Sequence, residues 1–145
     1  MPGILVGIDG SGHSERALQW AMKEAALRHT SVTVLAVRQA VSGWGHAEPF
    51  PGDQAAIDET SQKAKAQADK VLAGLDGPHP EAVTVRTVQG FPAEEIVNAG
   101  ADADMIVLGQ RGGGGWSRQL MGSVSREVTH HSTVPVVIIP MEKKS

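Results

Sequence analysis

Short, continuous apolar runs alternate along this chain with stretches that carry apolar residues at helical spacing. The runs lack the polar–apolar alternation of a half-exposed strand, and this is typical of parallel strands that are covered on both faces. Parallel strands need long crossover connections, which the intervening stretches can supply. The predicted strands are Ile4 to Ile8, Val32 to Val37, Ala82 to Val88, Met105 to Leu108 and Val134 to Ile139.

The stretches between these runs predict helices. The first is expected from about Ser14, a good N-cap, with Glu15 in the first turn, where a carboxylate favours the helix dipole. Further helices are expected from about Gln54, from Pro92, and from Ser123 to His131. Residues 39–53 show no periodicity and predict a long surface loop. The order predicts a single α/β domain over residues 1–145, with an open, doubly wound, Rossmann-like sheet of five parallel strands.

Composition narrows the class of partner. The chain has no cysteine, which excludes disulfides, thiolate metal sites and thiol nucleophiles. Its net charge is −3, its charges are scattered, and aromatic residues make up 3%, so DNA and RNA are disfavoured as partners. The chain begins without a secretory signal, and no window approaches the about 18 apolar residues of a membrane span. We therefore expect a cytoplasmic protein with no membrane partner.

Ligands of doubly wound sheets bind beyond the carboxyl ends of the strands, where the strand order reverses. Two segments of this chain suit that place. One is Asp9-Gly10-Ser11-Gly12, directly after the first predicted strand, and the other is the glycine-rich loop from Gly109 to Ser123 after the fourth. Asp9 could also be only a turn-former, since Asp-Gly is a common turn pair.

The glycine-rich loop has the chemistry of a phosphate-binding segment. Glycine lets a backbone approach a ligand closely, and the loop ends at a predicted helix start, where free N–H groups favour an anion. The alternative is a surface loop that binds nothing. Two common phosphate motifs do not fit: no lysine occurs in the loop, as a P-loop requires, and no register of the glycines satisfies G-x-G-x-x-G.

The loop does match the spacing G-x2-G-x9-G-[ST], through Gly109, Gly112, Gly122 and Ser123. This resembles the ATP-binding motif of universal stress proteins. The resemblance covers nearly the whole chain: Ile4 to Asp9 is similar to the family's first strand with its terminal Asp, Ala103-Asp104 to the start of its fourth strand, and Ser132 to Val137 to its last.

The resemblance implies a set of site residues. Asp9 matches the acidic residue near the nucleotide and its Mg²⁺, and Val37 matches an adenine-side contact. The ribose and phosphate segment is matched by Gly109, Arg111 and Gly112, and its far end by Gly122, Ser123 and Val124. One departure is Gly7, where some ATP-binding members of the family carry proline, which leaves the contacts from the first strand open.

The function implied is that of a regulatory ATP-binding module in the stress response. Two other classes stay open: a slow ATPase, and a chaperone-like dimer whose glycine loop is vestigial. An adenylyl-transferring enzyme is disfavoured, because the chain has neither an H-I-G-H signature nor an S-G-G-x-D-S loop. No catalytic residue is predicted. The family resemblance also implies a homodimer through Val134 to Ile139, an apolar last strand that the chain's own C-terminal residues could cover instead.

Overall fold

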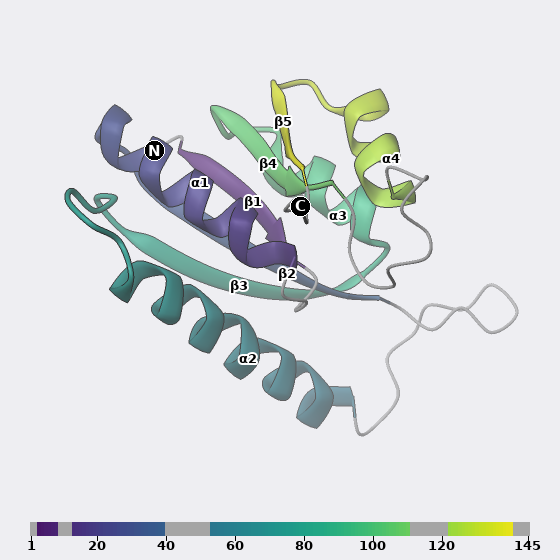
Figure 1. Ribbon diagram of the computed structural model, residues 1–145. Coiled ribbons are helices and arrows are strands. Elements are labelled where there is room, and N and C mark those ends of the chain that lie inside the picture. The colour runs from purple at the N-terminus through teal and green to yellow at the C-terminus, as the bar shows by residue number, and fades with distance from the viewer. Residues whose placement is uncertain (1–2, 9–12, 40–52, 111–121, 141–145) are drawn as a thin grey trace, which may run out of the picture.

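The fold is seen in a computed structural model, which describes residues 3–8, 13–39, 53–110 and 122–140. Strands and helices alternate along the chain (Figure 1). The elements are β1 (Ile4–Ile8), α1 (His13–Arg28), β2 (Val32–Gln39), α2 (Asp53–Ala73), β3 (Val83–Gly90), α3 (Pro92–Gly100), β4 (Met105–Gly109), α4 (Ser123–His131) and β5 (Val136–Ile139).

The strands form one sheet in the order β3-β2-β1-β4-β5, and all neighbouring pairs are parallel. The chain therefore winds outward in one direction from β1 to β3, returns to the centre at β4, and ends at the opposite edge with β5. This confirms the predicted open, doubly wound α/β sheet of five parallel strands.

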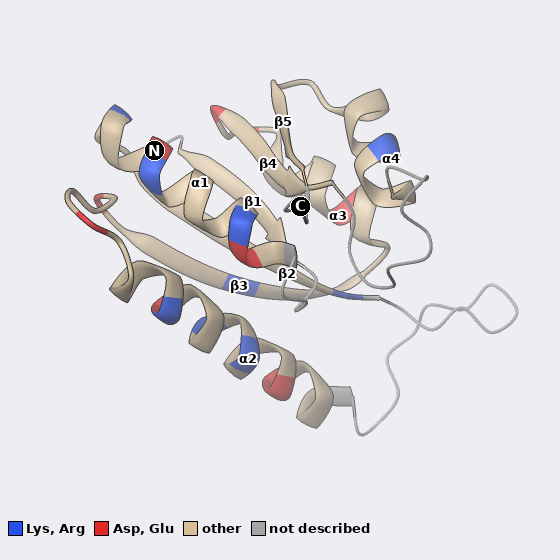
Figure 2. Cartoon of the chain, in the orientation of Figure 1, with Lys and Arg blue, Asp and Glu red and all other residues tan. Residues whose placement is uncertain are grey.

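The helices cover the sheet in two layers. On one face α1 and α2 pack over a core that contains Leu18, Met22 and Val34, all fully buried. On the other face α3 and α4 enclose a smaller core that contains Leu35, Ile106 and Val128. Both β1 and β4 are uncharged along their whole length, whereas all four helices contain charged residues (Figure 2).

Two glycines allow α3 to approach the central strands closely. A Cβ at Gly100, the last residue of α3, would lie 2.5 Å from side-chain carbons of Ile106 on β4. A Cβ at Gly7 on β1 would lie 2.9 Å from Leu108 and 3.0 Å from Ile96. Side chains from α3 and β4 thus fill the space that a side chain at position 7 would need.

Several predicted boundaries need correction. The helix α1 begins at His13, so Ser14 is a buried residue of the first turn and not the N-cap. The strand β2 continues two residues beyond Val37. The strand β3 is shifted, beginning at Val83 and continuing to Gly90. Local periodicity cannot fix such ends, because the last hydrogen bonds of a strand depend on its neighbours.

The last strand is shorter than predicted, because β5 begins at Val136 and not at Val134. Ser132 holds the preceding residues in a turn: its hydroxyl donates to the carbonyl of Val134 at 2.7 Å and accepts from the Val134 N–H at 3.1 Å. Pro135 follows, and proline has no N–H for the sheet. The predicted loop 39–53 includes the end of β2 and the start of α2, and its residues 40–52 lie outside the described part of the chain.

None of the helices among the described residues is long and apolar enough to cross a membrane.

Candidate functional site

The strand order reverses between β1 and β4, which are neighbours at the centre of the sheet. Their register pairs Val6 with Val107, so Ile8 and Gly109 end the two strands at the same level. On the other side of β1, Ile8 pairs with Ala36, which puts Val37 one residue further toward the same edge. The sheet thus brings two predicted site residues, Gly109 and Val37, to the edge where ligands of this architecture bind.

Val37 is only half-buried, and its side chain packs against the core of the α3/α4 face. Its register partner on β3 is Val88. The next residue, Arg38, donates from Nη1 to Oε1 of Gln89 at 3.0 Å, which ties β2 to β3 just beyond Val37. The position of Val37 is therefore fixed by the sheet itself.

The first end of the glycine-rich loop is attached to the last strand of the sheet. Gly109 is the final residue of β4 and pairs with Ile139 of β5. The following N–H, that of Gln110, donates to the carbonyl of Ile139 at 2.8 Å. Both residues are half-buried, so the backbone at this end is held while part of it stays accessible.

The second end of the loop is the start of α4. Gly122 is the N-cap, with φ at 82° and ψ at 130°, a left-handed φ that glycine adopts without strain. No side chain of the described residues makes a capping hydrogen bond there. Ser123 is exposed and Val124 half-buried. The first-turn N–H groups of α4 thus keep the capacity to bind an anion, which the helix dipole also favours.

A buried serine that sequence reasoning missed joins the two ends. Ser125 is 3% exposed, and its hydroxyl donates to the carbonyl of Gly109 at 3.0 Å, with the carbonyl of Gln110 at 3.4 Å. One signal in the sequence points to it: Ser125 lies three residues before the buried Val128, on the apolar side of an amphipathic helix.

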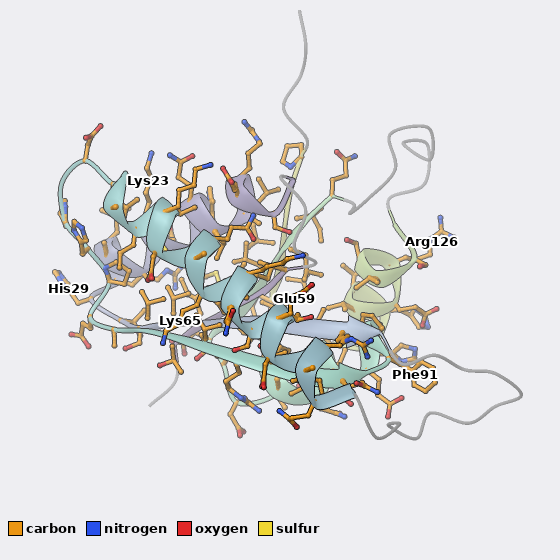
Figure 3. All side chains as sticks on the ribbon, turned by 90° about the horizontal axis from the view of Figure 1, so that it is seen from below. Lys23, His29, Glu59, Lys65, Phe91 and Arg126 are labelled. Carbon is orange, nitrogen blue, oxygen red and sulfur yellow. The ribbon has the colours of Figure 1, made fainter. Side chains whose placement is uncertain are left out.

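Three predicted site residues, Asp9, Arg111 and Gly112, lie outside the described residues, so their roles stay predictions. Within the described ranges, no group of three or more histidine and carboxylate side chains could hold a metal ion. Arg126, in the second turn of α4, is exposed and points away from the body of the molecule (Figure 3). Its N–H donates to the carbonyl of Gly122 at 3.1 Å, the first hydrogen bond of the helix.

A separate groove of about 360 Å³ lies between α3 and α4. The exposed ring of Phe91, labelled in Figure 3, borders it. Val97 and the carboxylates Glu94 and Glu127 also line it. Glu127 also pairs with His131 at 3.3 Å. Two carboxylates would repel a phosphate, so this groove is a poor place for a nucleotide.

Comparison with known proteins identifies one family, and similar relatives belong to it. Residues 2–140 match the universal stress protein family. A universal stress protein of Mycolicibacterium smegmatis is 33% identical over 140 residues, which cover 94% of this chain and 47% of that protein. One from Mycobacterium tuberculosis is 35% identical over 139 residues, covering 93% of this chain and 44% of the relative. The chain thus spans about half the length of the curated relatives it matches.

Solved structures agree in fold. A universal stress protein in complex with cAMP is 25% identical, with a TM-score of 0.68, and the match covers 97% of this chain and 98% of that one. One from Archaeoglobus fulgidus in complex with dAMP is also 25% identical, with a TM-score of 0.64 and coverage of 96% and 98%. A third, from Lactobacillus plantarum, reaches a TM-score of 0.74 at 21% identity and covers 95% and 97%, and it supports the fold alone.

Proposed function

Because this chain belongs to the universal stress protein family, we propose that it binds ATP at the carboxyl ends of β1 and β4 and acts as a regulatory nucleotide-binding module in the stress response. The observation that carries the proposal is the hydrogen bond that joins Gly109 to Ser125 in the first turn of α4, a helix start that no described side chain caps, at the point where the strand order reverses. A half-buried backbone at Gly109 and first-turn N–H groups that no described side chain caps suit a phosphate chain at this edge.

The proposal assigns a role to each predicted residue. Val37 contacts the adenine side, and the backbone of Gly109 lies along the ribose. Gly122, Ser123 and Val124 supply N–H groups, and the exposed Ser123 hydroxyl a further hydrogen bond, to the phosphates. Arg111 and Gly112 complete the segment through the motif spacing. Mg²⁺ would be held mainly by the phosphates, with Asp9 as the nearby carboxylate.

The relatives support an adenine nucleotide in general. The solved structures with cAMP and with dAMP share an adenine, a ribose-type sugar and one phosphate with ATP. ATP adds two phosphates and a higher negative charge, which the glycine-rich loop and the arginine at position 111 favour. A direct competition among ATP, cAMP and AMP therefore distinguishes a site for ATP from a site for adenine nucleotides in general.

The test is the Gly122→Val variant, with calorimetric titration of ATP and Mg²⁺. A branched side chain there blocks the approach of phosphate to the backbone, so the binding signal should disappear. Gly77→Val is the matched control: Gly77 also has a positive φ, at 102°, and apart from its two chain neighbours no atom of the described residues lies within 4 Å of its would-be Cβ. Both variants carry the same kind of backbone strain, and circular dichroism should find both folded. Unchanged ATP affinity in Gly122→Val would remove the loop from the site.

We further propose that the protein binds ATP but hydrolyses it only slowly. Efficient phosphoryl transfer needs a residue that positions the attacking water; the sequence offers Gln110 and His13 as candidates, and neither lies in a recognisable catalytic signature. Single-turnover assays with labelled ATP and Mg²⁺ measure this directly. A rate above about one per second, the low end of ordinary enzyme turnover, would make the protein an enzyme.

A homodimer through β5 is the proposed assembly. The strand is at the sheet edge, and three of its four residues, Val136, Val137 and Ile138, are apolar and only half-buried. An apolar edge strand favours pairing with a second copy. Sedimentation at micromolar concentration should give twice the chain mass of 15.2 kDa. A strictly monomeric mass would favour coverage by the residues after Pro140 of the same chain.

A further inference from the structure

Two polar side chains are buried among the described residues, and both are serines in the first turn of a helix. Ser14, 6% exposed, follows β1 in α1, and Ser125, 3% exposed, follows β4 in α4. β1 and β4 are the two strands between which the strand order reverses. A buried hydroxyl costs free energy unless it is hydrogen-bonded, so the partner it takes indicates what it does there.

Ser125 takes an unusual partner for a helical hydroxyl. Serine and threonine within helices commonly bond back to a carbonyl three or four residues earlier. Thr129 of the same helix does this, donating to Arg126 at 2.9 Å, and Thr60 of α2 donates to Ala56 at 3.0 Å. Ser125 instead donates to the carbonyl of Gly109, 16 residues earlier and on a different element.

This hydrogen bond fixes α4 relative to the end of β4. Gly109 is the first glycine of the loop motif, and Gly122, three residues before Ser125, is the last. A ligand that contacts both the Gly109 backbone and the first-turn N–H groups of α4 needs these two ends at one separation. A site in which they are already held avoids the ordering cost that a loose site incurs on binding.

We propose that Ser125 is a positioning residue of the nucleotide site, a role that rests on the proposed function. It lies outside the recognised spacing of the motif and is too buried to reach a ligand at the surface of the site. Its hydroxyl acts through Gly109, holding the start of α4 against the carboxyl end of β4. The simpler alternative is a structural hydrogen bond whose loss lowers stability without any selective effect on nucleotide binding.

The first experiment compares Ser125→Ala, Ser125→Thr and Thr129→Ala by calorimetric titration of the whole chain with ATP and Mg²⁺. Loss of one buried hydrogen bond that binding depends on should weaken ATP affinity about tenfold in Ser125→Ala. Ser125→Thr keeps the hydroxyl and should recover most of that loss. Thr129→Ala removes a hydroxyl of the same helix that donates within that helix, to Arg126, so the ATP affinity of this variant should equal that of the unmodified chain.

The second measurement is amide hydrogen exchange in the nucleotide-free protein, which does not depend on ATP. In Ser125→Ala the N–H groups of Arg126 and Gln110, bonded to Gly122 and Ile139, should exchange about tenfold faster. Those in the middle of α1 and α2 should not change. The same substitution should therefore loosen the two ends of the loop and leave the opposite face unaffected.

The two readouts separate the possible failures. If the unmodified chain binds no ATP, the proposed function is wrong, whatever the exchange rates show. If exchange accelerates in Ser125→Ala but ATP affinity is unchanged, the function stands and the positioning role is refuted. If affinity falls while exchange stays as before, Ser125 contacts the ligand itself, which also refutes the role. Weaker binding together with faster local exchange, rescued by threonine, is the result we expect.

Discussion

The two faces of the sheet are built differently. Under α1 and α2, helices of 16 and 21 residues, lies the larger core. Under α3 and α4, helices of 9 residues each, the core is smaller, and the elements are placed by close glycine contacts and a buried hydroxyl. One face thus supplies most of the apolar burial, and the other positions the candidate site. A single sheet can separate these tasks because its two faces are covered by different crossovers.

The α1/α2 face is stabilised mainly by the amount of apolar surface that it buries. Small residues along one side of α1, among them Ala17, Ala21 and Ala25, are fully buried and allow the helix to lie close to β1. Leu18 and Met22 fill the space beside them. Burial of apolar surface is worth about 25 cal/mol per Å², so long helices with several large buried side chains contribute most to folding.

The largest loss of stability should come from removing side-chain volume in the core under α1 and α2. Leu18→Ala deletes most of a fully buried side chain and leaves a cavity, so the free energy of unfolding should fall by about 2–5 kcal/mol. Leu27→Ala, on the same helix but 74% exposed, is the control and should change it by less than about 0.5 kcal/mol. Urea unfolding followed by circular dichroism measures both. Similar losses in the two variants would mean that the α1/α2 face does not carry the main core.

An intermediate effect is expected where α3 meets the sheet. Gly100→Ala places a Cβ 2.5 Å from Ile106, so α3 or the Ile106 side chain must shift, at a cost of about 1–3 kcal/mol. Gly74→Ala is the control, since its Cβ would meet neighbouring atoms only at 3.6 Å. If Gly100→Ala were as stable as the unmodified chain, the close approach on the α3/α4 face would not matter. Its unfolding should be measured under the same urea conditions.

The smallest effect is expected between the two helices of the larger face. Lys70 of α2 and Glu15 of α1 form a salt bridge at 3.2 Å, and both side chains are well exposed, at 71% and 39%. Exposed pairs of this kind contribute about 0–1 kcal/mol and weaken with salt. Glu15→Gln should therefore lower stability by no more than this at low ionic strength and have no effect in about 1 M salt. A larger loss that disappears in about 1 M salt would show that charge pairing, and not only apolar burial, joins α1 to α2, whereas a salt-insensitive loss would show that Glu15 acts other than through its charge.

Much of this architecture could be predicted from the sequence. The apolar run Ile4–Ile8 and the helices Pro92–Gly100 and Ser123–His131 occur where local pattern and helix-start signals predicted them. The spacing of Gly109, Gly112 and Gly122 resembled that of the universal stress protein family, to which the chain belongs. These signals depend on residues close together in the chain, which is why single-sequence reasoning could find them.

What the tertiary structure decided depends on residues far apart in the chain. No local pattern indicates that Ser125 donates to Gly109 and not to its own helix, or that Gly100 meets Ile106. The start of β5 at Val136 likewise follows from the turn at Ser132 and from pairing with β4. Hydrophobic periodicity selects the elements and the class of sheet, because burial depends on which face a residue occupies. Hydrogen-bond partners and close contacts are chosen only after the elements have packed, since they require two distant backbones to meet within a few ångströms.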